Sequence, residues 1–272
     1  MKCAWKELLA ILPPKLRQKI PKDDLWEIRL RTGCSTELVG SRGSLWLDPP
    51  VTRDDLSFVV NTASRYSPWT AQTMARGYIT APGGHRIGLG GEVVVNQGQI
   101  TGLREVYSLC IRVARDVGGI GRAYAGLSGS VLIVGPPGAG KTTMLRDLCR
   151  ELSRKETVAV VDERGEIFPA GFDRGQALDV LSLCPKPEGI DMALRTLSPS
   201  TIAVDEITEE SDAQALLKAG WCGVRLLATA HGADITDLKI RPVYRSLTEN
   251  HLFDHVLICF RDKSRPTERM DI

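Results

Sequence analysis

The fold of this chain is decided by the stretch Gly135-Pro136-Pro137-Gly138-Ala139-Gly140-Lys141-Thr142-Thr143. It fits the pattern of a phosphate-binding P-loop: Gly, any four residues, Gly-Lys, and then Ser or Thr. The apolar run 131–134 before it predicts a buried strand. After the loop, apolar residues recur at helical spacing at Met144, Leu145, Leu148 and Leu152. Strand, glycine loop and helix are the context that the motif requires, so we expect an α/β nucleotide-binding domain.

Each part of this loop has a chemical reason. Glycines at 135, 138 and 140 let backbone N–H groups converge on phosphate oxygens, and the helix N-terminus adds a partial positive charge. Lys141 is expected to reach the β- and γ-phosphates, and Thr142 to hold Mg²⁺. The alternative is a glycine turn that binds nothing. It is disfavoured because the lysine, the hydroxyl, the strand and the helix all occur in register.

Composition and charge argue against a membrane-spanning protein and indicate a basic first half. The chain has 272 residues, enough for two domains, and no apolar run approaches the roughly 18 residues of a membrane span. Residues 1–122 carry 17 Lys+Arg against 11 Asp+Glu, a net charge of +6, and residues 123–272 carry 18 against 22, a net charge of −4. A basic first half suggests an anion or an acidic surface as its partner, and the alternative is a solvated basic face.

Cysteine spacing and the N-terminus indicate the compartment. The seven cysteines are far apart and form no C-x-x-C pair, which predicts reduced, mostly buried thiols and argues against a metal site. The N-terminus is charged and is broken by Pro13-Pro14, so no secretion signal is evident. We therefore expect a cytoplasmic protein.

The first half predicts a smaller α+β domain over residues 1–117. A helical pattern stops at Pro13-Pro14, and Thr52 is expected to cap a second helix. The glycine-rich run 82–91 suggests tight turns around a short strand. Strands are expected at 26–31, 45–47, 78–80, 92–95 and 108–113.

The second half alternates strand and helix over residues 125–272, after a glycine-rich linker at 118–124. Such alternation predicts a mainly parallel sheet covered on both faces, with its ligand site at the carboxyl ends of the strands. A helix is expected at 212–219. The expected strands are 131–134, 158–161, 201–204, 226–229 and 256–260.

Polar residues follow three of these strands. The strand at 201–204 ends in Asp205-Glu206, the Walker B pattern, in which Asp205 is expected to hold Mg²⁺ and Glu206 to orient or deprotonate the attacking water. The strand at 158–161 leads into Asp162-Glu163-Arg164-Gly165-Glu166, and the strand at 226–229 leads into His231. A single histidine at a strand end is more often structural than catalytic, but the order of the motifs favours a functional role here.

That order resembles the secretion ATPases, the RecA-like motors of type II and type IV secretion and of pilus systems. The segments 193–199 and 228–232 match the signatures of that family. Within it, the chain most resembles the sporulation branch found in endospore-forming bacteria. The runs that carry this likeness are 27–33, 77–80, 84–88, 161–164 and 212–217, and the resemblance covers nearly the whole chain.

The resemblance implies a RecA-like domain that binds and hydrolyses ATP with Mg²⁺. The P-loop, from Gly135, Pro136 and Pro137 to Thr143, would hold the phosphates. Glu163, Glu166 and Glu206 compete for the role of catalytic carboxylate, His231 would sense the γ-phosphate, and Arg195 would act between subunits. Arginines of the N-terminal domain would close over the nucleotide of the same or an adjacent subunit, with Arg86, Arg112 and Arg115 as the best candidates. Each of these arginines has the alternative of a surface ion pair.

The implied protein is a homo-oligomer, expected to be a hexamer, that works at the inner face of a membrane with other secretion or sporulation channel proteins. Its Walker B strand ends in Asp-Glu where many secretion motors have Gly-Glu, so the division of labour between Asp205 and Glu206 is open. The alternatives are a nucleotide-operated switch and a nucleic-acid-stimulated ATPase. The chain has no RNA-recognition signature, which disfavours nucleic acid as a partner.

Overall fold

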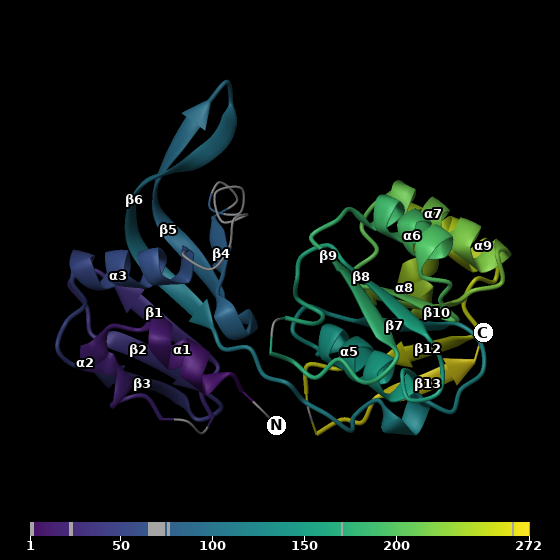
Figure 1. The fold of residues 1–272 in the computed structure, drawn as a ribbon, viewed down its shortest axis with the longest axis horizontal. Helices are drawn as coiled ribbons and strands as arrows, with labels where there is room; N and C mark the ends of the chain where they lie inside the picture. Colours follow the sequence, from purple (N-terminus) through teal and green to yellow (C-terminus); the bar gives the residue numbers. More distant parts are fainter. Residues whose placement is uncertain are drawn as a thin grey trace. The chain divides into compact units, whose positions relative to one another are not determined.

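The computed structural model describes residues 3–21, 24–64, 74, 77–169, 171–262 and 264–271. The chain divides into two compact units (Figure 1). The first contains Met1–Asp116 and Pro169–Phe172, and the second contains Val117–Phe168 and Asp173–Ile272.

The first unit is a six-stranded antiparallel sheet with helices packed on one face. The strand order is β3-β2-β1-β6-β5-β4. Ile28 and Leu30 alternate with polar residues along β1 and share one core with Leu8 and Leu56 of the helices, as the period-two pattern predicts. The elements are α1 Trp5–Ile11, α2 Pro14–Arg17, β1 Glu27–Arg31, β2 Thr36–Gly40, β3 Gly43–Leu47, α3 Arg53–Ser64, β4 Tyr78–Thr80, a 3-10 turn at Pro82–Gly84, β5 Arg86–Asn96 and β6 Gln99–Arg112.

The start of α3 confirms the predicted cap. The backbone N–H of Asp55 donates to Oγ1 of Thr52 over 3.2 Å, and the backbone N–H of Thr52 donates to Oδ2 of Asp55 over 2.7 Å. This reciprocal pair satisfies two amides at the helix N-terminus that would otherwise lack partners.

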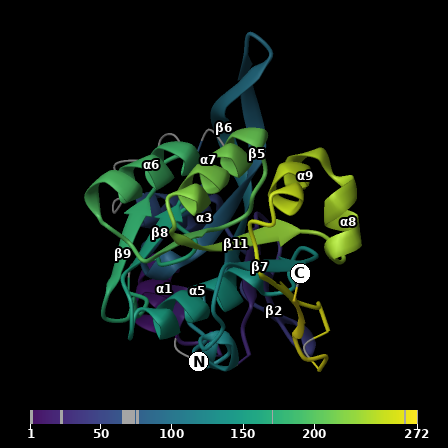
Figure 2. The ribbon, with the colours of Figure 1, turned by 90° about the vertical axis from the view of Figure 1, so that its right-hand side faces the viewer.

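The prediction of tight turns around a short strand at 82–91 is wrong for most of that run. Only Pro82–Gly84 forms a turn, and β5 runs from Arg86 to Asn96, with a register shift against β6 between Gly90 and Gly91. Gly88 and Gly90 lie opposite Cys110 and Ser108, while Ile87 is buried in the core. The glycines are therefore tolerated because they lie on the other face of the strand from the buried residues. β5 and β6 continue beyond the sheet as a two-stranded hairpin (Figure 2).

The second unit is a seven-stranded sheet in the order β13-β12-β7-β11-β10-β8-β9. The strand pairs are parallel except for β12 with β13. The elements are a 3-10 turn at Arg122–Tyr124, β7 Val131–Gly135, α5 Lys141–Leu152, β8 Val158–Asp162, β9 Leu178–Ser182, α6 Lys186–Thr196, β10 Thr201–Val204, α7 Glu210–Trp221, β11 Arg225–His231, α8 Ile235–Ile240, α9 Pro242–Glu249, β12 His255–Ile258 and β13 Glu268–Asp271.

This sheet is covered on both faces, which confirms the prediction from strand–helix alternation. Val131 and Ile133 share a core with Leu145 and Leu148 of α5. The alternate residue Leu132 packs in the second core, with α6, α7, α8 and α9. Figure 2 shows α5 on one side of the sheet and α6 and α7 on the other. The five predicted strands are all present, whereas β9 and β13 were not predicted.

The edge strand β13 differs from the other strands. Its four residues, Glu268, Arg269, Met270 and Asp271, are all exposed, and three of them are charged. Among the described residues no helix has the length and apolar character to span a bilayer. Of the seven cysteines, Cys149 and Cys259 are buried, Cys34 and Cys222 are exposed, and the rest are half-buried, so the expected burial holds for only part of the set.

Candidate nucleotide site at the strand ends

Four neighbouring parallel strands bring the predicted motifs to one edge of the sheet. β7, β11, β10 and β8 are adjacent, in that order. Because parallel strands end at the same edge, the P-loop, His231, Asp205 and Asp162 lie together at this edge. The convergence expected from the sequence is therefore present within the second unit.

The P-loop glycines are required by space and by backbone angle. A Cβ atom added at Gly135 would lie 2.4 Å from the carbonyl oxygen of Cys259. Gly138 and Gly140 have φ angles of 78° and 91°, which disfavour other residues. Gly140 immediately precedes Lys141, the first residue of α5. The helix N-terminus therefore opens at the loop, where its unpaired amides favour an anion.

Lys141 is held at the centre of the site. Its Nζ donates to the carbonyl oxygen of Pro136 over 3.2 Å and lies 3.1 Å from Nδ1 of His231. The residue is 7% exposed, and burial lowers the pKa of its ammonium group, while Asp205 and Glu206 act in the opposite direction. The ammonium group is thus partly desolvated and held beside hydrogen-bond acceptors.

Thr142 and Asp205 meet as the Mg²⁺ prediction requires. Oγ1 of Thr142 donates to Oδ2 of Asp205 over 2.8 Å. The second carboxylate oxygen, Oδ1, accepts from Oγ1 of Thr229 over 2.5 Å. Oγ1 of Thr229 also accepts from the backbone N–H of Glu206 over 2.8 Å. Hydroxyl and carboxylate oxygens are the ligands that Mg²⁺ prefers, so the residues present fit the ion.

His231 connects Lys141 to Glu206. Its Nε2 lies 3.2 Å from Oε1 of Glu206, and its Nδ1 faces Nζ of Lys141. Because Lys141 can only donate, this arrangement assigns the proton of a neutral imidazole to Nε2, which donates to Glu206. The other oxygen of Glu206, Oε2, accepts from Nη1 of Arg164 over 2.6 Å. Glu206 also has a φ angle of 46°, a conformation that few residues other than glycine adopt.

The acidic segment after β8 is organised by Asp162, not by its glutamates. Asp162 is buried and accepts three hydrogen bonds, from the backbone N–H groups of Glu166, Ile167 and Phe168. Burial raises the pKa of its carboxyl group to about 6, against the lowering effect of the amides. Arg146 of α5 donates to the carbonyl oxygens of Glu166 and Ile167. This loop is therefore fixed by backbone contacts.

Glu163 is bound by a buried lysine. Nζ of Lys186 donates to Oε2 of Glu163 over 2.6 Å and lies 3.2 Å from Oδ2 of Asp212. Burial alone would lower the pKa of Lys186, but its bonds to these two acids outweigh burial and raise it. Asp212 in turn belongs to the capping box of α7. Glu163 is thus tied to the start of α6 and α7, whereas Glu206 is tied to Lys141 through His231.

The four predicted arginines are not on the strand ends that carry the P-loop, His231 and Asp205. Arg195 is near the end of α6, which leads back to the start of β10 at the opposite edge of the sheet, and it pairs with Asp191. Arg86, Arg112 and Arg115 lie in the first unit. Arg86 lies over the ring of Tyr78 at 4.1 Å, Nε of Arg112 is 3.9 Å from Glu27, and Arg115 donates to the carbonyl oxygen of Leu25. Their predicted roles at a nucleotide remain predictions.

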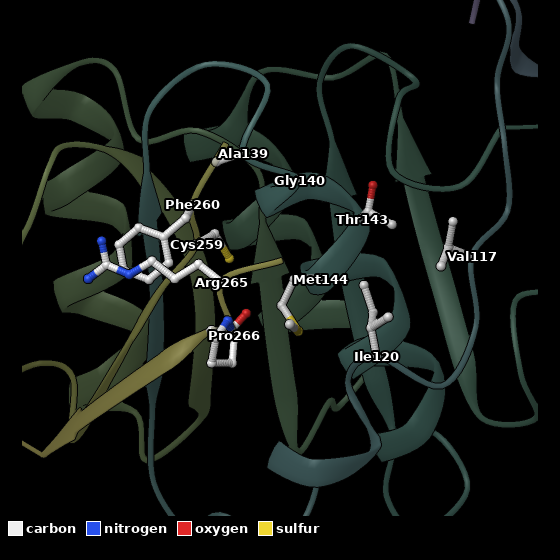
Figure 3. Close-up of a pocket in the computed structure, with 11 residues that line it drawn as sticks. Val117, Ile120, Ala139, Gly140, Thr143, Met144, Cys259, Phe260, Arg265 and Pro266 are labelled. Atoms are coloured by element: carbon white, nitrogen blue, oxygen red, sulfur yellow. The ribbon is translucent and has the colours of Figure 1, made fainter. Parts of the chain in front are cut away.

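A pocket of about 400 Å³ adjoins the P-loop (Figure 3). Ile120 and Met144 line one side, and Phe260 and Pro266 line the other. The guanidinium of Arg265 lies 3.5 Å from the centre of the Phe260 ring. An apolar pocket that opens onto Ala139 and Gly140 suits a flat ring attached to a phosphate chain. The sequence did not predict it, because its walls come from three separate segments: the stretch before β7, the start of α5 and the stretch after β12.

A family model described as "Sporulation stage III, protein AA" matches residues 6–271. The chain belongs to this family. Stage III sporulation protein AA of Bacillus subtilis (strain 168) is 37% identical over 96% of the chain and 92% of that protein. The resemblance to the sporulation branch of the secretion ATPases is thereby confirmed.

Solved structures show the fold of this family member. It is similar to the Legionella pneumophila ATPase DotB, with a TM-score of 0.58, 18% identity and coverage of 86% of the chain and 72% of that structure. It is also similar to the pilus retraction motor PilT, solved with bound ADP, with a TM-score of 0.61, 15% identity and coverage of 86% and 74%. The predicted RecA-like α/β fold, together with the antiparallel N-terminal sheet, is confirmed.

Proposed function

We propose that the chain is a Mg²⁺-dependent, ATP-hydrolysing motor of the secretion ATPase type. The observation that carries this proposal is the hydrogen bond of 2.8 Å between the P-loop hydroxyl of Thr142 and Asp205 of Walker B. It is supported by His231, whose Nδ1 contacts Lys141 and whose Nε2 contacts Glu206. The similar structures are described as an ATPase and as a motor with bound ADP, which supports the same substrate for this chain.

The P-loop would hold the phosphates, and the pocket beside it would hold the base. The P-loop amides and Nζ of Lys141 bind the β- and γ-phosphates, and Phe260 and Met144 face the adenine. Thr142 and Asp205 would hold Mg²⁺, which neutralises phosphate charge when it is bound. These residues position ATP with its γ-phosphate towards the ends of β10 and β11.

Glu206 is the carboxylate that we assign to the attacking water. It lies one residue after Asp205, and its own position is fixed by Thr229, His231 and Arg164. It orients the water and accepts its proton at a carboxylate oxygen. His231 senses the γ-phosphate through Lys141. When Nζ of Lys141 moves towards the phosphate, Nδ1 of His231 loses its hydrogen-bond donor. In this assignment Glu163 and Glu166 have structural roles. Glu163 pairs with Lys186 at the start of α6, and the backbone N–H of Glu166 binds Asp162.

The motor acts as a homo-oligomer, which we propose to be a hexamer. In such a ring, Arg195 lies at a subunit boundary, where its exposure of 73% leaves it accessible to a neighbour. Arg86, Arg112 and Arg115 close over a nucleotide of the same or an adjacent subunit. We propose that the ring works at the cytoplasmic face of a membrane, on a secretion or channel complex formed during sporulation, as the family description suggests.

Calorimetry followed by turnover measurements tests this function. ATP is titrated into the wild type and into Lys141→Ala, each with and without Mg²⁺, and phosphate release is then measured. Mg²⁺-dependent binding with turnover in the wild type alone supports the motor. Binding without turnover, unchanged in Glu206→Gln, supports a nucleotide-operated switch. Turnover that appears only on addition of DNA or RNA supports the nucleic-acid-stimulated alternative, and absence of ATP binding overturns the proposal.

A further inference from the structure

A second pocket lies on the other face of the seven-stranded sheet. It has a volume of about 270 Å³ and is bounded by Leu132 of β7 and by Tyr244 and Leu247 of α9. Leu132 packs in the core of α6–α9, whereas its neighbours Val131 and Ile133 pack against α5, the helix that follows the P-loop. The sheet therefore separates this pocket from the P-loop.

The pocket is apolar at its base and polar at its rim. Leu132, Leu247 and Phe253 are buried side chains, and a volume of this size among them accommodates an apolar group. Lys239 and His251 are exposed and also line the pocket. Neither the ammonium group of Lys239 nor the imidazole of His251 has a hydrogen-bond or ion-pair partner among the described residues. None of the described residues that line the pocket is acidic.

The backbone of His251 has an unfavourable conformation. Its φ angle is 48°, in the left-handed region that glycine normally occupies where a helix ends. The amide of Leu252 donates to the carbonyl oxygen of Leu247 over 3.1 Å, which closes the end of α9 in the form usually built on glycine. A histidine at this place directs an imidazole to the pocket at the expense of local strain. Such strain is characteristic of binding sites.

Tyr244 links the pocket to the Walker B loop. Its ring lines the pocket, and its hydroxyl donates to the buried carbonyl oxygen of Ile207 over 2.9 Å. The amide of Ile207 donates to the carbonyl oxygen of Thr229 over 3.0 Å. Ile207 directly follows Glu206, whose φ angle of 46° lies in the left-handed region. A shift of the Tyr244 ring would therefore be transmitted to Glu206.

We propose that this pocket binds a small carboxylic acid with an apolar body, and that occupancy stabilises the Walker B loop through Tyr244. The carboxylate pairs with Lys239 and His251, and the apolar body contacts Leu132, Leu247 and Phe253. The size of the pocket and its polar rim favour a single small molecule over a polypeptide segment. This site is distinct from the proposed ATP site.

Octanoate is the probe for binding, measured on the full chain by saturation-transfer NMR and by titration. We expect saturable binding that weakens about fivefold in Lys239→Gln. The matched control Lys155→Gln removes an exposed lysine on the α5 side of the sheet and leaves the affinity unchanged. Thr248→Phe, which fills the rim, abolishes binding. Octanol, which keeps the chain and lacks the charge, binds more weakly than octanoate. Equal binding of octanol, equal binding to Lys239→Gln, or no binding of octanoate overturns the proposed site.

Hydrogen exchange at the amides of Glu206 and Ile207 measures the coupling without nucleotide. Octanoate slows exchange at both amides in the wild type. In Tyr244→Phe, which keeps the ring and loses the hydroxyl, octanoate still binds but does not slow exchange. Unchanged exchange in the wild type at saturating octanoate overturns the coupling. Because none of these measurements uses ATP, their failure is distinguishable from failure of the proposed motor activity.

Discussion

The hydroxyl group of Thr229 donates a hydrogen bond of 2.5 Å to Oδ1 of Asp205, from the neighbouring strand. The hydroxyl oxygen of Thr229 in turn accepts a hydrogen bond from the backbone N–H of Glu206 over 2.8 Å. One buried side chain of β11 thus contacts both acids that follow β10, at the carboxylate of Asp205 and at the backbone N–H of Glu206. These contacts support the roles that we propose, Asp205 for Mg²⁺ and Glu206 for the attacking water.

Thr229→Val removes this hydroxyl and keeps the shape of the side chain. The amide of Glu206 then loses its acceptor, and Asp205 loses a donor, each worth about 1–3 kcal/mol when buried. We expect Mg²⁺-dependent ATP affinity to fall about tenfold and turnover to fall further, as measured by calorimetry and phosphate release. The control is Thr196→Val, an exposed threonine of α6. Equal effects of the two variants would refute the role of Thr229.

Lys141→Ala tests the P-loop directly. A charge-assisted hydrogen bond contributes about 1.5–3 kcal/mol, so we expect ATP to bind about 10- to 100-fold more weakly. Lys155→Ala removes an exposed lysine of the turn after α5 and serves as the control for charge. An unchanged dissociation constant for Lys141→Ala would show that ATP does not use this loop.

Glu206→Gln separates the three candidate carboxylates. Loss of a general base lowers turnover by about 10²–10⁴. We expect this loss in Glu206→Gln, with ATP binding retained. Glu163→Gln and Glu166→Gln are expected to retain turnover within about tenfold, because Glu163 is engaged with Lys186 and the acidic loop is held by Asp162. A larger loss in either of these two variants would reassign the catalytic carboxylate.

The affinity for ATP depends on pH through Lys141. Burial holds the pKa of the ammonium group below its ordinary value of 10.5. A bound triphosphate favours the charged form and raises this pKa, so binding takes up a proton between the two values. Affinity therefore falls as the pH rises through that window. Calorimetry over a series of pH values below 10.5, in buffers of different ionisation enthalpy, measures the uptake. Lys141→Arg, which stays charged, should show none; an equal uptake there would exclude Lys141 as its source.

Arg195→Ala tests whether Arg195 acts between subunits, without a change in the stability of the fold. Arg195 is exposed and its pair with Asp191 is worth about 0–1 kcal/mol, so the midpoint of unfolding should stay unchanged. If the residue acts between subunits, turnover falls, and turnover per subunit in the wild type rises with protein concentration. Mixing in Lys141→Ala subunits should then reduce activity. Turnover per subunit that is flat from nanomolar to micromolar protein would argue against shared sites.

The central strands of the second unit were predictable because each is a continuous apolar run buried on both faces, as at 131–134 and 201–204. β9 and β13 were not, since β9 is only partly buried and β13 is almost entirely charged. β2 was missed as well, because its run is short and lies next to turn residues. The glycines of β5 were mistaken for turns because the sequence does not reveal which face of a strand is left without side-chain packing.

The sequence predicted that the motif residues after the central strands lie at one edge of the sheet, but it did not predict their contacts. Thr142 and Asp205 carry recognisable motifs, and the parallel sheet brings them together. The contacts of Arg164, Lys186 and Thr229 were not predicted, although Arg164 and Thr229 lie in segments that carry the family resemblance, because these contacts depend on side-chain directions in separate elements. A similar limit applied to the pocket at Phe260, whose walls are formed by segments distant in the chain.

The charged strand β13 has a consequence for how copies of this protein can meet. The unpaired backbone groups of a strand at the edge of a sheet can pair with a strand of another molecule, and repeated pairing of this kind produces fibrils. Here the last strand presents Glu268, Arg269 and Asp271 to solvent, so a second copy adding in register would place like charges beside one another. Uncontrolled polymerisation along this side is therefore discouraged even at high concentration.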